Sequence, residues 1–363
     1  MRTFNTLMLP EITAGTVRSA LAGLVYASLP SSVPDLNNLA LVDDWLAHHA
    51  PAGGPEARTW ALREVLTRQV TQQLHSLRQV WGYAQPADQT RTQALQAIQA
   101  DGCTGNPEVI GWSWLYYRYI RVELGLSPQA YSQAAGLDTR SLRRYQQYAV
   151  QRLAQQLFQA EVALREREQQ RHLRAALPGT LPPRLLGREA EISWLRQPQH
   201  VQITGPSGIG KTALVETVVH QGIAAGAYDH VIWLPAPTSL VGVRQPLHRS
   251  ADRLVLIVDE GDVLREAPDQ VADLLATWRE STVYLISPTY LPQLVTMAHL
   301  ALRGLDQPAM TALVRDLYQQ HHGEQVFMPD DLTLAWLWAE SAGCPAAVYQ
   351  QVKALWYGPE AGL

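Results

Sequence analysis

Residues 201–214 are VQITGPSGIGKTAL, and this stretch decides how the rest of the chain can fold. A short β-type run leads into a glycine-rich turn, and a helix-compatible run begins at Lys211. The turn fits the pattern G-x-x-x-x-G-K-[ST]. Backbone N–H groups of such a loop converge on phosphate oxygens, and the helix that follows points its positive end at them. The stretch therefore predicts a phosphate-binding loop between a strand and a helix.

Each residue type in this loop has a chemical role. The glycines let the backbone curl tightly without Cβ clashes. Lys211 is placed to reach the outer phosphates, and Thr212 to offer its hydroxyl to Mg²⁺. The predicted ligands are ATP or ADP with Mg²⁺, and the predicted nucleotide-binding residues of the loop are Gly205, Pro206, Ser207, Gly208, Ile209, Gly210, Lys211, Thr212 and Ala213.

A second stretch, LVLIVDE at residues 254–260, strengthens this prediction. Its continuous apolar run is typical of a strand buried on both faces. Asp259 would emerge at the carboxyl end of that strand, where open α/β sheets bind ligands, and would hold Mg²⁺. Glu260 would orient or deprotonate an attacking water, so Lys211, Asp259 and Glu260 are the predicted catalytic residues. The alternative is an ordinary buried strand that ends in two solvated acids.

Composition sets the broad class. The chain has 363 residues, 47% of them hydrophobic and 17% charged, which is ordinary for a globular protein with two or three domains. The net charge of −4 favours neither nucleic acid nor a membrane as a general partner. The two cysteines form no metal-ligand spacing, and no apolar run is long enough to cross a membrane. We therefore expect a cytoplasmic protein with no membrane partner.

The first 105 residues indicate helices and no chemistry. Helices are expected over residues 13–28, 35–49 and 56–82, because apolar residues recur there at helical spacing. The three histidines in this region have no metal-ligand spacing, so packed or surface histidines are the simpler interpretation.

Residues 106–177 contain a helix–turn–helix pattern. An aromatic-rich helix is expected over residues 108–124, followed by Ser127 as N-cap and Pro128 at the first position of a short helix. Gly136 turns the chain, and a longer helix starts near Arg140. Its first turns would present DNA-contacting arginines, with residues 127–152 as the DNA-binding segment: Arg140, Arg143 and Arg144. The alternative is a structural module whose arginines form a solvated face.

The second half alternates strands and helices. After a Pro- and Gly-rich linker at 178–183, strands are expected at 201–204, 231–234, 254–258 and 283–287, with helices at 211–224 and 267–280. This alternation predicts a mostly parallel sheet covered on both faces. Beyond residue 300 only helices are expected, at 306–320, 331–342 and 346–357.

The predicted fold class is therefore multidomain, with α and α/β parts. An all-helical N-terminal half precedes a parallel-sheet P-loop core and a small helical lid. The expected domains are a helical domain of unknown role (1–105), the helix–turn–helix module with a long linking helix (106–177), the NTPase core (178–300) and the lid (301–363).

Four pieces in this order resemble the STAND class of P-loop NTPases, close to the NB-ARC type. They are Gly187-Arg188-Glu189, the loop 205–212, the strand ending in Asp259-Glu260, and Gly343-Cys344-Pro345. Residues 112–160 resemble the helix–turn–helix module found ahead of such ATPases in multidomain bacterial regulators. The resemblance covers residues 110–363.

The resemblance implies further roles. Gly187 and Arg188 would lie near the adenine through main-chain contacts, and Pro345 would pack on the adenine from the lid. Proteins of this class are nucleotide-gated switches that ADP keeps closed and that ATP opens and oligomerises. They usually carry an arginine after the fourth strand that senses the γ-phosphate. Here that place is Ser287-Pro288-Thr289-Tyr290, so sensing would be lost or moved to Thr289, and arginines such as Arg265, Arg279 or Arg315 could act in trans.

Three functional interpretations follow. The first is a STAND switch with weak ATPase activity that forms a homo-oligomer with ATP and signals through its helix–turn–helix region in transcriptional regulation or defence. The second is an AAA-like ATPase loaded on DNA that serves a separate protein effector or transposition partner. The third is a non-catalytic nucleotide-binding scaffold.

Overall fold

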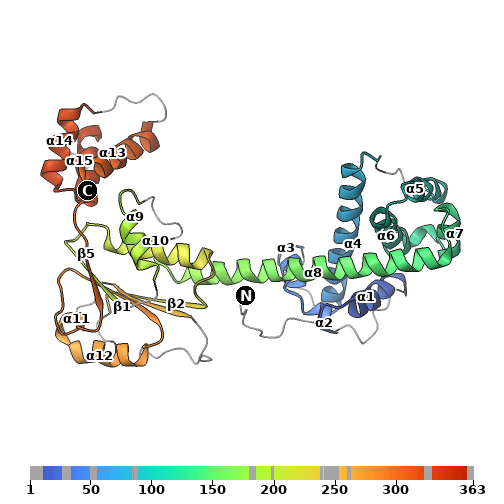
Figure 1. The fold of residues 1–363 in the computed structure, drawn as a ribbon, viewed down its shortest axis with the longest axis horizontal. Coiled ribbons are helices and arrows are strands. Elements are labelled where there is room, and N and C mark those ends of the chain that lie inside the picture. Colours follow the sequence, from blue (N-terminus) through green and yellow to red (C-terminus); the bar gives the residue numbers. More distant parts are fainter. Residues whose placement is uncertain are drawn as a thin grey trace. The chain divides into compact units, whose positions relative to one another are not determined.

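A computed structural model gives the fold as two compact units, residues 1–167 and 168–363 (Figure 1). It describes residues 11–26, 34–49, 55–83, 85, 89–179, 185–197, 200–237, 240, 253–259, 263–322 and 329–357. Helices and a parallel sheet are both present, as the predicted α and α/β fold class requires. The finer domain boundaries stay predictions.

The N-terminal unit is helical. Its elements are α1 (Ala14–Tyr26), α2 (Pro34–Asn37), α3 (Ala40–His49), α4 (Pro55–Val80), α5 (Arg91–Cys103), α6 (Pro107–Leu115), η1 (Tyr116–Ile120), η2 (Val122–Leu124), α7 (Pro128–Ala134) and most of α8 (Thr139–Ala175). One hydrophobic cluster from Val17 to Leu157 contains side chains from both sides of the predicted boundary at residue 105. Trp112, Tyr117 and Tyr131 are among its largest buried side chains.

The two helices expected on either side of Gly136 are present as α7 and α8, while their identity as a helix–turn–helix module stays a prediction. Ser127 caps α7 by accepting a hydrogen bond from the Ala130 N–H, and Pro128 occupies the first turn. Asp138 accepts from the N–H groups of Arg140 and Ser141, so a carboxylate caps the start of α8. The Ser132 hydroxyl donates to the Leu137 carbonyl at 2.6 Å and fixes the turn between the two helices.

Two expected helices are broken. The helix predicted over 108–124 is α-helical only to Leu115 and then widens into the π-helical turn η1, where the Arg121 N–H donates to the Tyr116 carbonyl. The helix predicted over 35–49 is divided into α2 and α3. A distant residue contributes to the second break: the buried Glu161 carboxylate on α8 accepts from the N–H groups of Ala40 and Leu41 at 2.8 and 3.1 Å. The N–H groups at the start of α3, which have no acceptor within the helix, thereby gain hydrogen-bond partners.

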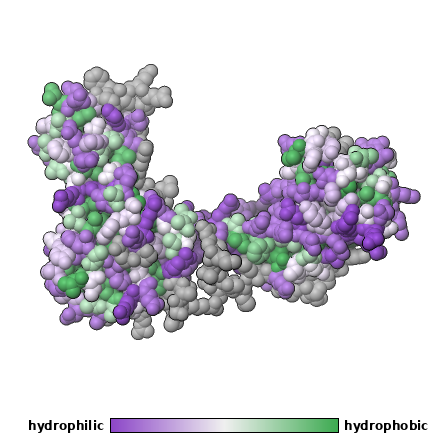
Figure 2. Space-filling view, in the orientation of Figure 1, coloured by the Kyte–Doolittle hydropathy of each residue, from purple (hydrophilic) through white to green (hydrophobic). Residues whose placement is uncertain are grey.

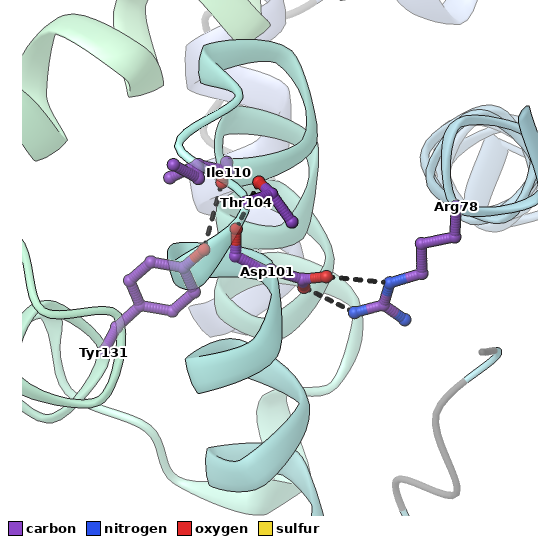
Figure 3. A network of polar contacts seen from close by, with 5 residues as sticks. All are labelled: Arg78, Asp101, Thr104, Ile110 and Tyr131. Carbon is purple, nitrogen blue, oxygen red and sulfur yellow. Dashed lines mark hydrogen bonds and ion pairs between the residues drawn. The ribbon is translucent and has the colours of Figure 1, made fainter. Parts of the chain in front are cut away.

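A buried ion pair joins α4 to α5 (Figure 3). Arg78 and Asp101 are 1% and 2% exposed, and Arg78 Nε lies 3.0 Å from Asp101 Oδ1 in a bidentate contact. Tyr131 of α7 donates its hydroxyl to the Ile110 carbonyl of α6 in the same region. Burial raises the pKa of Tyr131, so the phenol stays protonated. These contacts tie the helix–turn–helix elements to the helices that precede them.

The C-terminal unit is built on a five-stranded parallel sheet. Its strands are β1 (His200–Thr204), β2 (His230–Pro235), β3 (Leu254–Asp259), β4 (Thr282–Ser287) and β5 (Ala298–Ala301), in the order β2-β3-β4-β1-β5. The first four confirm the predicted strands. β5 was not predicted, because its four residues form a short edge strand that alternates between half-buried and exposed side chains.

Helices cover both faces of this sheet (Figure 1). On one face α9 (Glu189–Leu195) and α10 (Lys211–Ala224) pack with residues such as Ile203, Ile257 and Ile286. On the other, α11 (Val263–Glu266) and α12 (Pro268–Thr277) pack with Leu256 and Leu285. Apolar runs without alternation therefore predicted the central strands correctly.

A small helical subdomain follows the sheet. It consists of α13 (Gln307–His322), α14 (Asp331–Ser341) and α15 (Pro345–Tyr357), which share a core around Met310, Leu337 and Val348. These helices span the residues of the expected lid, and they are called the lid below as a label only, since a lid function stays a prediction. No helix within the described ranges is long and apolar enough to cross a membrane. Figure 2 shows hydrophobic side chains scattered among hydrophilic ones over the visible surface.

We predict that Asp101→Ala destabilises the N-terminal unit by about 3–5 kcal/mol, because it leaves the Arg78 guanidinium buried without its counter-charge. Urea unfolding followed by circular dichroism measures the loss. The pair of the half-buried Arg121 with the exposed Glu123 provides the control, since Glu123→Ala should cost less than about 1 kcal/mol. Equal stability losses in the two variants would contradict the conclusion that the buried Arg78–Asp101 ion pair stabilises the N-terminal unit more than the Arg121–Glu123 pair does.

Candidate nucleotide-binding site

The predicted phosphate loop connects β1 to α10. Gly205, Gly208 and Gly210 have φ angles of 149°, 77° and 97°, values that an L side chain rarely adopts. Gly210 is the N-cap of α10 and offers no capping side chain. The first N–H groups of α10 therefore have no intrahelical acceptor and point out of the helix start. This arrangement is suited to an anion.

Lys211 lies inside the curl of the loop. Its side chain is 4% exposed, and its ammonium donates to the carbonyl oxygens of Gly205 and Pro206 at 2.9 and 3.1 Å. A buried ammonium requires acceptors, and these carbonyls provide them. The charge is consequently held at the loop rather than on an extended, solvated side chain.

Thr212 and Asp259 meet across the carboxyl edge of the sheet. The Thr212 hydroxyl donates to Asp259 Oδ1 at 3.3 Å, joining the first turn of α10 to the end of β3. The two predicted metal-binding residues are thus neighbours although they come from different strand–helix units. Glu260, the third predicted catalytic residue, lies outside the described residues.

The donor set fits Mg²⁺ bound with a nucleotide. A hydroxyl and a carboxylate oxygen are hard ligands, and Mg²⁺ usually takes one or two protein oxygens together with phosphates and waters. Within the described ranges no group of three or more His, Cys, Asp or Glu side chains could hold a metal by itself. Phosphate oxygens would therefore have to complete the coordination.

Gly187 and Arg188 lie against the lid. A Cβ at Gly187, whose φ is 68°, would stand 2.3 Å from the Ala309 Cβ of α13. Arg188 is buried, and its guanidinium donates to the Glu191 carboxylate and to the Arg303 carbonyl. The arginine therefore joins the start of α9 to the segment that leads into the lid.

The other end of the lid contacts the phosphate loop. The Ala346 N–H, in the first turn of α15, donates to the Gly208 carbonyl at 3.3 Å. Cys344 Sγ lies 3.8 Å from the Ser207 carbonyl. Pro345 is the first residue of α15 between these two contacts. The structure thus brings the Gly343-Cys344-Pro345 segment to the loop, while a role of Pro345 at the adenine stays a prediction.

The predicted DNA-contacting residues belong to the N-terminal unit. Arg140, Arg143 and Arg144 are exposed near the start of α8, and the Arg144 guanidinium stacks 5.2 Å from the centre of the Tyr145 ring. Contact of these arginines with DNA stays a prediction.

Sequence reasoning missed a polar cluster at the end of the sheet. Gln202 lies in the middle of β1, and Ser287 ends β4. The Gln202 amide nitrogen and the Ser287 hydroxyl both donate to the Thr289 carbonyl, at 3.4 and 2.8 Å. A glutamine inside the otherwise apolar stretch VQIT was the available signal.

Comparison with known proteins leaves the chain without a family. No protein-family model matches it, and no curated protein does. Among solved structures, the structure of C. elegans PCH-2 is similar over 54% of this chain and 63% of that chain, with 14% identity and a TM-score of 0.26. The similar region spans less than two thirds of the PCH-2 chain.

We predict that Gly208→Ala releases the lid from the phosphate loop. The new Cβ would stand 2.7 Å from the Ala346 Cβ, closer than real Cβ atoms approach. Loss of the Ala346–Gly208 hydrogen bond should accelerate amide hydrogen exchange at residues 346–349 at least about 10-fold, since local opening controls such exchange.

Gly226→Ala is the matched control. Gly226 has a similar φ of 64°, but nothing lies within 4 Å of a Cβ placed there. It shares the backbone strain without touching the lid. Equal acceleration at residues 346–349 in both variants would show that backbone strain, and not the lid contact, is responsible.

Proposed function

We propose that the C-terminal unit binds ATP or ADP with Mg²⁺ and acts as a nucleotide-gated switch of the STAND type. The observation that carries the proposal is the hydrogen bond between Thr212 and Asp259 beside the uncapped start of α10. Together with the buried Lys211 it supports the proposal, because an uncapped helix start, a cation and two hard oxygen ligands then lie at one edge of a parallel sheet.

Each residue would act on the phosphates in a defined way. The N–H groups at the start of α10 would donate to phosphate oxygens, and Lys211 would exchange its carbonyl acceptors for the outer phosphates. Thr212 and Asp259 would hold the metal, which neutralises phosphate charge when bound. Hydrolysis would additionally need an oriented water, the role predicted for Glu260.

The lid supplies the candidate gating element. The Gly208–Ala346 contact closes α15 on the phosphate loop, and the Gly187–Ala309 contact packs α13 on the segment before the sheet. A nucleotide bound at the loop would have to displace or rearrange these contacts and would thereby favour one of two lid positions, which is what a switch requires.

Packing between α10, which follows the loop, and the C-terminal end of α8 also supports a switch, because movement at the loop could be passed on to α8. The helix α10 buries Glu216 and His220 beside the end of α8, where Leu173 and Leu177 join the core of the C-terminal unit. Burial lowers the pKa of His220, an effect opposed by Glu216 and reinforced by Arg174, so the imidazole is neutral at neutral pH. Displacements of α10 would therefore act on the C-terminal end of α8 through packed contacts.

The proposal predicts that Lys211→Ala weakens binding of ADP·Mg²⁺ and of a non-hydrolysable ATP analogue at least about 10-fold, because a charge-assisted contact to phosphate is lost. Isothermal titration measures both affinities. Light scattering on the same samples should show the wild-type particle growing with the ATP analogue and the variant particle staying constant.

Lys353→Ala is the matched control, since Lys211 and Lys353 are the only lysines of the chain. Lys353 is exposed on α15, where it lies over the Tyr349 ring. Nucleotide binding unaffected by Lys211→Ala would contradict the proposed site. If the wild type binds nucleotide but its particle does not grow with the ATP analogue, the nucleotide site stands and the assembly step is excluded. The scaffold interpretation would then be favoured.

A second candidate function is DNA binding through residues 127–152, favoured by the exposure of Arg140, Arg143 and Arg144. The end of the N-terminal unit that carries α7 is strongly hydrophilic (Figures 1 and 2). On this view the protein would couple nucleotide state to DNA, either as a regulator or as an ATPase serving a separate effector or transposition partner.

We predict that the double variant Arg140→Gln/Arg143→Gln weakens binding of duplex DNA about 10-fold or more in low salt, where phosphate contacts are strongest. Fluorescence anisotropy with a labelled duplex provides the measurement. Arg167→Gln/Arg171→Gln removes two exposed charges farther along α8 and should have little effect. Equal losses, or no DNA affinity in the wild type, would exclude this interface.

A further inference from the structure

A series of hydrogen bonds at the carboxyl edge of the sheet runs from Gln202 through Thr289 to the guanidinium of Arg265. Gln202 is 1% exposed within β1, and its amide oxygen has no hydrogen-bond partner. Burying an amide in an apolar sheet costs free energy unless its contacts compensate. Its nitrogen donates to the Ser287 hydroxyl and to the Thr289 carbonyl, which also accepts from Ser287. This buried pair therefore fixes the position of Thr289.

Thr289 in turn holds an arginine. Its hydroxyl accepts a hydrogen bond from Arg265 Nη2 at 3.0 Å. Arg265 lies in α11, the short helix after β3, and its side chain is exposed. The guanidinium carries five N–H donors, so a bond from one nitrogen to Thr289 orients it while other donors can face a ligand.

The sheet topology places this arginine beside the proposed nucleotide site. β4 lies between β1 and β3, with Ser287 aligned to Thr204 and Ile286 aligned to Asp259. The ends of β1 and β3 are therefore about 10 Å apart, two strand spacings. The Thr212–Asp259 hydrogen bond links the segment that follows β1 to the end of β3. Thr289 lies two residues beyond the end of β4, the strand between them. Arg265, Lys211 and Asp259 thus share one edge of the sheet.

We propose that Arg265 binds the terminal phosphate of ATP and gives the site its preference for ATP over ADP. The inference rests on the proposed function and names the residue that distinguishes the two ligands. Lys211 and the start of α10 hold the phosphates nearest the loop. Arg265 comes from the far side, beyond Asp259 in the chain, and a guanidinium there pairs with the additional charge and oxygens of a third phosphate.

The simpler interpretation is a surface arginine that only stabilises a turn. The two interpretations differ in one respect: a structural contact affects ATP and ADP binding alike, whereas a contact to the terminal phosphate affects ATP alone. The ratio of the two affinities is therefore the informative quantity. Because the Arg265 side chain is exposed, its substitution removes no core packing.

The experiment is calorimetric titration of the full chain with ADP·Mg²⁺ and with the non-hydrolysable analogue of ATP·Mg²⁺. Arg265→Gln should weaken analogue binding about 10- to 100-fold, the range of a charge-assisted hydrogen bond, and change ADP binding less than about twofold. Thr289→Val should shift the ratio in the same direction by a smaller factor, and Thr289→Ser should restore it. Combining Arg265→Gln with Thr289→Val should add nothing to the arginine variant, because the two residues act through one contact.

Arg279→Gln is the matched control, an exposed arginine between α12 and β4, at the opposite edge of the sheet. The inference is overturned if Arg265→Gln leaves analogue binding unchanged, weakens both ligands equally, or behaves like Arg279→Gln. Failure of the proposed function is distinct: the wild type would then bind neither ligand, or Lys211→Ala would bind both as the wild type does.

Discussion

All strands of the described sheet are parallel, and the arrangement of the candidate site depends on this constraint. Parallel strands end at a common edge of the sheet. The loop after β1, Asp259 at the end of β3 and Thr289 after β4 are therefore brought to this edge by strand order alone. The Thr212–Asp259 hydrogen bond is the local consequence. It joins two residues that lie 47 positions apart in the sequence.

The lid depends on the same edge in a different way. After β5 the Leu302 N–H donates to the Thr204 carbonyl at 2.7 Å, so the chain leaves the sheet directly beside the phosphate loop. The lid returns to the loop at Gly208, where the absence of a side chain admits Ala346. Loop and lid are therefore held together by close backbone packing, which a ligand at the loop would have to accommodate.

Patterns with a single physical cause were predictable from sequence. The apolar run before Asp259, the glycines of the loop and the Ser127-Pro128 start of α7 each depend on local chemistry, and the structure has the expected elements there. Contacts between distant residues were not predictable. The α2–α3 break is stabilised by Glu161, about a third of the chain away, and the Arg265–Thr289 contact requires knowledge of strand order.

The most direct measurement of the central claim is amide hydrogen exchange of the wild-type chain with and without ADP·Mg²⁺. The account predicts slower exchange at residues 205–213, where backbone N–H groups would donate to phosphates, and at residues 343–347 of the lid. Exchange in helices α4 and α5 of the N-terminal unit provides the internal reference. Unchanged exchange at 205–213 under saturating nucleotide, or protection confined to another region, would contradict the proposed site.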